Sequence, residues 1–328
     1  MKYFTHPEGI FEIKIPLDWY YKNKVAGIAE KSPFSFELYE NTKGAFQISC
    51  YNKNEKKISS ELPNGKYNQN KLKFIQSKLH DDEFKILLWG TTVEDYFFMA
   101  KYVCQPTLEN NQEIEEEIKK VEKCLSTLMF LSLDRRRLAI SFDRFEKFNG
   151  SLAASFDLKE NAIKNNSFIE LIIINSNQID AYLRLCIVHK FQILENSNLF
   201  KIEYLFQGET DKPIFEKQIY DKASKMDIIS KEQHNKLYKL YNLRNKVVHR
   251  YIITDIKTYE LREIAVDYEI LCEEIRLVLA DIETEQFEKK VGYHGDKDPH
   301  RTRDQDHIKE LHSLVNDKHF IDNYHRTL

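Results

Sequence analysis

The chain is organised around the stretch Leu243-Arg244-Asn245-Lys246-Val247-Val248-His249-Arg250-Tyr251. This stretch holds a fixed cation, a titratable imidazole and a phenol, and no other part of the chain so closely resembles a reactive site. Ser230 and Gln233 have the spacing of a capping box, which predicts that a helix begins near Lys231 and carries the stretch. Apolar residues then recur at helical spacing, at Leu237, Leu240, Tyr241, Val247, Val248 and Tyr251.

Arg244 and His249 point in different directions on this predicted helix. At about 100° per residue, the two side chains lie roughly 140° apart. One copy of the helix therefore has difficulty aiming both groups at one substrate atom. Two copies packed about a two-fold axis can each supply both groups to a shared cleft, so we expect a homodimer formed through the helical part of the chain.

The pattern Arg244-x4-His249, with Asn245 directly after the arginine, resembles the signature of the HEPN superfamily of small helical domains, many of which are metal-independent ribonucleases. Tyr251 extends it to Arg-x4-His-x-Tyr, which resembles HEPN toxins that are paired with a nucleotidyltransferase antitoxin. The resemblance covers roughly residues 150–290 and implies an all-α bundle there. It also implies that Tyr251 is the residue to which the antitoxin adds AMP.

The resemblance implies RNA cleavage by the substrate's own 2′-hydroxyl, without a metal or another cofactor. His249 would remove the 2′-OH proton, because an imidazole can accept a proton near neutral pH. Arg244 would neutralise the pentavalent phosphorane with its planar set of donors. The products would be a 2′,3′-cyclic phosphate and a 5′-hydroxyl. The implied role is that of a toxin or antiphage effector, with an antitoxin or a phage-derived trigger as a further partner.

Other residues are expected to support this site. Asn245 would orient the phosphate or His249, while Lys246 and Arg250 add local positive charge for binding RNA. Tyr251 can contact RNA if it is not the modified residue. Asp180, on a long apolar helix predicted over residues 165–193, is our choice for an acidic side chain that reaches the same cleft.

Arg184 and His189 have the same spacing, but we reject this pair as the site because it lies in an apolar run without the asparagine and with Phe191 in place of the tyrosine. Two alternatives remain open. In the first, Arg244 and His249 form a structural pair in a fold that binds nucleotides or dimerises without catalysis. In the second, the N-terminal part carries the main role, as a chaperone-like or scaffold domain.

Composition limits the class of protein. A length of 328 residues fits one or two domains, and a net charge of −3 gives no general basic bias towards nucleic acid. The five cysteines are scattered without metal-site spacing, which indicates buried free thiols in a reducing compartment. We find no signal-peptide pattern and no run of about 18 apolar residues, so we expect a cytoplasmic protein without a membrane span.

Residues 1–133 read as an α+β sensor or regulatory domain with an antiparallel sheet. Alternating apolar residues predict strands at 11–15, 34–38, 46–50, 84–89 and 96–103, the second and third as a hairpin, with helices at 70–79 and 112–131. The opening Phe-x-Ile-x-Ile-Pro-x-x-Trp pattern, which ends at Trp19, is similar to the start of PsbP-like domains.

The remaining chain reads as a linker, a helical domain and a polar tail. Residues 134–150 contain three successive arginines and are the predicted linker. Residues 151–290 form the HEPN-like bundle, with helices over 165–193, 213–226 and 258–287 besides the one that carries the motif. Residues 291–328 are a polar extension with one helix at 305–316. Its six histidines, at 294, 300, 307, 312, 319 and 325, lack the spacing of a zinc site, so no metal is expected.

Overall fold

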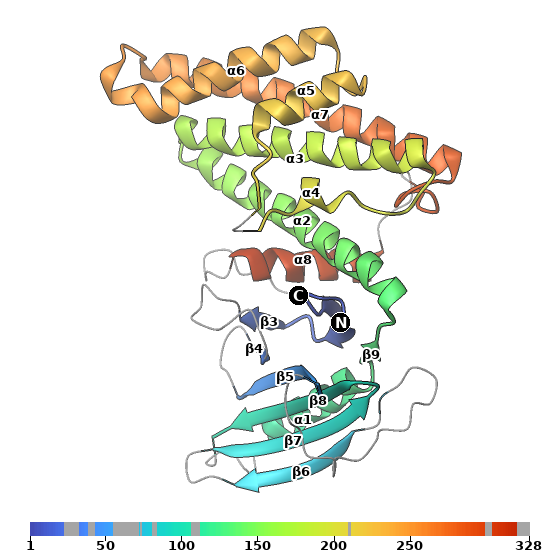
Figure 1. The fold of residues 1–328 in the computed structure, drawn as a ribbon. Helices are drawn as coiled ribbons and strands as arrows, with labels where there is room; N and C mark the ends of the chain where they lie inside the picture. Colours follow the sequence, from blue (N-terminus) through green and yellow to red (C-terminus); the bar gives the residue numbers. More distant parts are fainter. Residues whose placement is uncertain are drawn as a thin grey trace. The chain divides into compact units, whose positions relative to one another are not determined.

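The computed structural model describes residues 1–22, 33–38, 43–54, 72, 74–80, 84–105, 112–208, 211–298 and 304–319. The chain divides into two compact units, Met1–Asp143 and Arg144–His325 (Figure 1). The first unit contains the sheets, and the second is helical in its regular structure. The predicted order, an antiparallel sheet region followed by a mostly helical part, is confirmed.

The described part of the first unit holds two antiparallel sheets. In spatial order the larger consists of β3 (Trp19–Lys22), β4 (Phe34–Leu38), β5 (Ala45–Asn52), β8 (Tyr96–Cys104), β7 (Lys85–Val93) and β6 (Ile75–His80). The smaller consists of β1 (Lys2–Thr5), β2 (Phe11–Ile15) and β9 (Met129–Phe130). Phe34 lies opposite Ile48, so the predicted pairing of β4 with β5 is confirmed, while the turn residues 39–42 lie outside the described residues.

Helix α1 (Gln112–Leu125) packs on this unit through one apolar side. Ile114 and Val121 are buried, and the indole nitrogen of Trp19 donates a hydrogen bond to Glu117 (3.0 Å). The helix predicted over 112–131 is longer than the observed α1, which ends at Leu125. Met129 and Phe130 instead pair with β2 as strand β9, a long-range contact that helical spacing within the segment does not reveal.

Two further predictions in the first unit were wrong. The helix expected over 70–79 is not formed, because residues 75–80 pair with β7 as strand β6; residues 70, 71 and 73 lie outside the described residues. The strand predicted at 84–89 ends too early, because β7 continues to Val93. The chain reverses at Glu94, whose φ of 48° is in the left-handed region that tight turns use.

The second unit is built from helices of very different length. They are α2 (Leu133–Lys164), α3 (Phe168–Glu195), α4 (Ile202–Leu205), α5 (Glu216–Lys225), α6 (Lys231–Arg250), the 3₁₀ turn η3 (Tyr251–Ile253), α7 (Thr258–Lys289) and α8 (Gln305–His319). Residues 134–150, predicted as a linker, belong to α2, and the boundary between the two units, between Asp143 and Arg144, falls within them. Arginine is a good helix former, and burial of Phe145 holds the segment in the bundle. Gly150 allows α8 to approach, because a Cβ there would lie 2.8 Å from Leu314.

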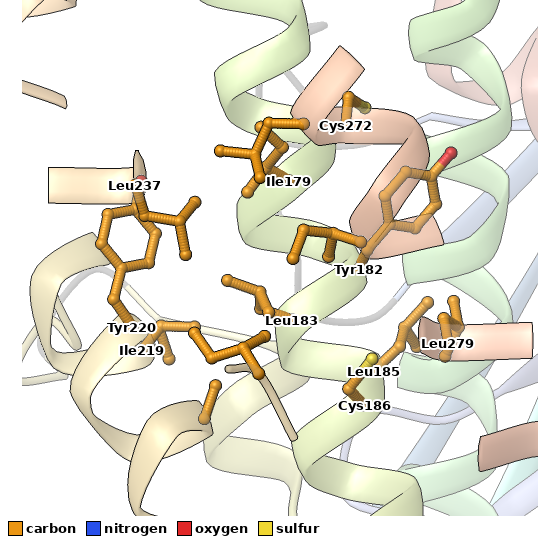
Figure 2. Packing of buried hydrophobic residues seen from close by; sticks show 14 of the residues in the cluster. Ile179, Tyr182, Leu183, Leu185, Cys186, Ile219, Tyr220, Leu237, Cys272 and Leu279 are labelled. Carbon is orange, nitrogen blue, oxygen red and sulfur yellow. The ribbon is translucent and has the colours of Figure 1, made fainter. Parts of the chain in front are cut away.

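Helix α3 lies at the centre of the second unit's core. In Figure 2, Leu183 of α3 points towards Tyr220 of α5, while Cys186 of α3 lies on the side of Leu279 of α7. Helix α3 is long and apolar enough to cross a membrane by length and composition, but 67% of its most apolar window is buried inside the unit. It therefore packs as a core helix of this unit.

Candidate functional site

Helix α6 carries the motif and begins where the capping box predicts. The Ser230 hydroxyl accepts from the backbone N–H of Gln233 (3.1 Å), and the Gln233 side chain accepts from the backbone N–H of Ser230 (2.9 Å). Leu237, Leu240 and Val247 are buried along the inner side of α6. The motif is therefore held on a helix with a fixed start and a packed inner face, as expected.

Arg244 points into the bundle and is bound by a carboxylate that the sequence reading did not identify. Its Nη1 donates to Glu216 Oε2 (2.6 Å), Glu216 Oε1 (2.9 Å) and Ser176 Oγ (2.6 Å). The two ion-paired side chains are only 17% and 16% exposed. Arg244 thus joins α6 to the first turn of α5 and to α3.

Glu216 is the centre of this polar cluster. Its Oε1 also accepts hydrogen bonds from the hydroxyls of Tyr220 (2.6 Å) and Ser176 (2.9 Å). Burial lowers the pKa of Arg244, but the adjacent Glu216 carboxylate raises it by more, so the net shift is upward and the guanidinium stays charged. Burial together with Glu216 raises the pKa of Tyr220, so its hydroxyl remains a donor.

Asp180, expected beside Arg244, is bound by another cation. Its Oδ2 accepts from Arg184 Nε (2.6 Å), and Arg184 also donates to the carbonyls of Tyr204 (3.3 Å) and Ile214 (2.9 Å). Burial raises the pKa of Asp180. Its Oδ1 is buried without a hydrogen bond in the part of the chain that the structure describes. Glu216, and not Asp180, is therefore the direct carboxylate partner of Arg244.

His249 lies in quite different surroundings from Arg244. It is exposed on the last turn of α6, as is Arg250, and Lys246, three residues before it, is exposed as well. Asn245 is half-buried and accepts a hydrogen bond from Arg244 Nη2 (3.1 Å). The structure therefore brings together Arg244 and Asn245 but leaves His249 on the surface, in agreement with the divergence expected on one helix.

Tyr251 lies at the start of η3 and packs, half-buried, against the helical core. The next two residues are unusually exposed for their type: Ile252 is 94% and Ile253 is 79% exposed. A set of large apolar side chains on α7 is exposed as well, at Tyr259, Val266, Ile270 and Leu277. At about 100° per residue these four lie within about 40° of one another, so they form one stripe along α7, called here the α7 stripe.

The rejected second match to the motif, Arg184 and His189, has no histidine that a substrate can reach. His189 is 1% exposed, and burial lowers its pKa to about 4, so the imidazole is neutral. The described residues nevertheless place it with two other groups of metal-ligand type, Glu283 and His294. Sequence spacing misses this cluster because its members come from α3, α7 and the segment after α7.

Comparisons with known proteins identify no family. No protein-family model matches the chain, and no curated protein is similar to it. A crystal structure of a protein from Bacteroides thetaiotaomicron is similar with a TM-score of 0.27 and 13% identity, over 53% of this chain and 68% of that chain. A likeness at this level carries no argument, so the function must be inferred from the residues of the site itself.

Proposed function

We propose that the helical unit is a metal-independent endoribonuclease of the HEPN type that acts as a homodimer. The observation that carries the proposal is the arrangement on α6. A guanidinium is held in place by Glu216, and the same helix ends in an exposed histidine between two exposed cations, Lys246 and Arg250. These groups suit binding and cleavage of a phosphodiester.

His249 is the proposed general base. Its imidazole is exposed at the end of α6, and Lys246 and Arg250 provide positive charge for neighbouring phosphates. In the proposed reaction His249 accepts the proton of the 2′-hydroxyl, whose oxygen forms a bond to the adjacent phosphorus. The bond from phosphorus to the 5′-oxygen breaks, and the leaving oxygen takes a proton from solvent, to which His249 later returns the proton that it accepted. The products are a 2′,3′-cyclic phosphate and a 5′-hydroxyl.

Arg244 can act without leaving Glu216. A guanidinium has five N–H donors, and the hydrogen bonds that Arg244 makes to the described residues use Nη1 and one direction of Nη2. Its Nε and the second Nη2 direction therefore remain for a phosphate oxygen. A positioned, permanently charged donor stabilises the charge that develops in the transition state without having to reorganise.

A second copy of the chain completes the proposed site. In one copy Arg244 faces the bundle while His249 faces solvent, so the two groups need a partner surface that closes over them. The exposed Ile252 and Ile253 follow the motif directly, and the α7 stripe follows them. Exposed large apolar side chains of this kind mark association surfaces, and a repeat of apolar residues on one side of a long helix favours helix–helix pairing.

We further propose that this nuclease is a cytoplasmic toxin or antiphage effector. RNA cleavage inside the cell would arrest growth, and the sheet-containing first unit would sense a trigger or restrain the nuclease. An antitoxin that adds AMP to Tyr251 would modify a residue two positions from His249. The bulk and charge of AMP would then block access of RNA to the adjacent histidine.

The proposal is tested with purified full-length protein and a labelled RNA of mixed sequence. The variants are His249→Ala and, as a matched control, His307→Ala, which removes an exposed histidine of α8. The wild type and the control should cleave equally, while His249→Ala should be slower by about 10²–10⁴-fold, the usual contribution of a general acid–base group. Equal cleavage by His249→Ala, or no cleavage by the wild type with or without its trigger, would overturn the proposal.

One observation favours a second candidate, a non-catalytic HEPN module that binds nucleotides or dimerises. The ion pair between Arg244 and Glu216 is mostly buried, as expected for an arginine that holds helices together. In that case calorimetry should detect nucleotide binding or the protein should dimerise, while RNA stays intact. Induced expression of the wild type and His249→Ala, with growth and RNA integrity followed together, separates the two candidates in cells.

A further inference from the structure

We propose that His189, Glu283 and His294 bind one divalent transition-metal ion, with Zn²⁺ the best match, and that this ion fastens α3, α7 and the segment after α7 to one another. One ligand atom from each residue lies within 4.8 Å of the other two, and His294 Nε2 is 3.6 Å from Glu283 Oε1. Tetrahedral zinc needs ligand atoms about 3.3 Å apart, given bonds of about 2.0–2.1 Å, so small side-chain rotations would close the site.

The hydrogen bonds around Gln286 determine which nitrogen of His189 is available. Gln286 donates through Nε2 to the backbone carbonyl of His189 (3.0 Å) and accepts through Oε1 from the backbone N–H of His294 (3.1 Å), which sets its amide orientation. The same Nε2 donates to Gln192 Oε1 (2.8 Å), which also accepts from the backbone N–H of Tyr293 (3.2 Å). The atom of Gln192 that faces the imidazole is therefore an oxygen.

It follows that His189 presents a lone pair on Nε2. Its Nδ1 lies 3.4 Å from Gln192 Oε1 and so carries the proton in a long hydrogen bond. A ligand histidine in a metal site usually donates its other ring N–H to such an acceptor, which sets both tautomer and ring orientation.

The segment that carries His294 is held in place by side-chain amides. The backbone N–H groups of Gly292, Tyr293 and His294 donate to Asn198, Gln192 and Gln286 respectively. Gly292 has a φ of +81°, and a Cβ there would lie 2.3 Å from the amide nitrogen of Gln286, so the close approach requires glycine. The ligand is therefore preorganised by the residues around it.

The donor set indicates the class of metal. Two imidazoles and one carboxylate suit zinc and its neighbours, whereas Ca²⁺ and Mg²⁺ prefer oxygen ligands only. Three protein ligands leave a fourth position for solvent. The site shares no residue with the proposed nuclease motif.

The test uses the full-length protein after removal of metal with a chelator. Zn²⁺ is titrated by calorimetry, bound metal is counted by mass spectrometry, and Co²⁺ is added to read its coordination geometry from visible absorption. The variants are Glu283→Gln and His294→Gln, which keep side-chain size, and His307→Gln is the histidine control outside the cluster. Circular dichroism of each metal-free variant confirms the fold.

We expect one zinc ion per chain in the wild type and the control, a tetrahedral Co²⁺ spectrum, and a higher unfolding temperature with zinc. Loss of a group next to a ligand already weakens metal sites by about 10–100-fold, so both ligand variants should bind more than tenfold more weakly. Wild-type protein that binds no zinc would overturn the proposal. Zinc bound equally by all four proteins would do so as well, because the ion would then lie elsewhere.

Discussion

The ion pair between Arg244 and Glu216 leads to a quantitative prediction for the variant Glu216→Ala. This change removes the one carboxylate paired with Arg244 among the described residues, together with the acceptor for the Tyr220 and Ser176 hydroxyls. Breaking a buried ion pair costs about 3–5 kcal/mol, and because these side chains retain 17% and 16% exposure we expect the lower end, about 3 kcal/mol. For a unit of this size the unfolding temperature should fall by about 6–12 °C.

The assay is calorimetric unfolding of the full chain, with Glu232→Ala as the matched control. Glu232 is a carboxylate 78% exposed that pairs with Lys236, so its removal should change the free energy of unfolding by no more than about 0.5 kcal/mol. The double variant Arg244→Met, Glu216→Ala should be more stable than the sum of the single effects predicts, by at least about 1 kcal/mol. Additive effects in the double variant would refute the assignment of Glu216 as the group that holds Arg244. A loss of unfolding free energy in Glu216→Ala no larger than that in Glu232→Ala would refute it as well.

Three further predictions concern the helix start, the proposed dimer and acid stability. Ser230→Ala removes the capping acceptor at the start of α6 and should lower the free energy of unfolding by about 1 kcal/mol in denaturant titration; an unchanged midpoint would contradict the role of the cap. Ile270→Glu places a charge in the α7 stripe, so light scattering should show a monomer and RNA cleavage should fall. A dimer that is unchanged in this variant would show that the interface does not include the α7 stripe. Burial and then Arg136 lower the pKa of His6 to about 4, so the unfolded state binds more protons than the folded state between pH 6.5 and about 4. The free energy of unfolding should therefore decline as pH falls through this window, and it should decline less in His6→Gln than in the wild type. The same pH dependence in both proteins would contradict this role of His6.

The features that could be predicted from the sequence are those set by local pattern. The start of α6 at Lys231 follows from the capping pair, and α7 follows from its apolar spacing; both depend on residues a few positions apart. Strand β9 and strand β6 could not be predicted because each forms only by pairing with a distant strand. Local preference in those segments does not specify the partner.

The candidate site likewise has features that could be predicted from the sequence and features that could not. The motif and the divergence of Arg244 from His249 follow from helical geometry, but Glu216 lies 28 residues from Arg244 and enters only when α5 packs beside α6. A carboxylate partner for an arginine within an apolar stripe is expected on physical grounds, but its identity depends on the fold. The ligand cluster of His189, Glu283 and His294 is hidden for the same reason, since each member comes from a different segment.

The most direct test of the central claim is cleavage of one defined RNA whose cut position has been mapped. The same oligonucleotide is prepared with a single 2′-deoxy nucleotide at that position, and both substrates are given to the wild type and to His249→Ala, with the product ends identified. The proposed mechanism predicts that the wild type leaves a 2′,3′-cyclic phosphate and a 5′-hydroxyl on the all-ribose RNA. It also predicts no cut at the deoxy position, and cleavage by His249→Ala that is slower by about 10²–10⁴-fold. Cleavage at the deoxy position, or cleavage by His249→Ala at the wild-type rate, would contradict it.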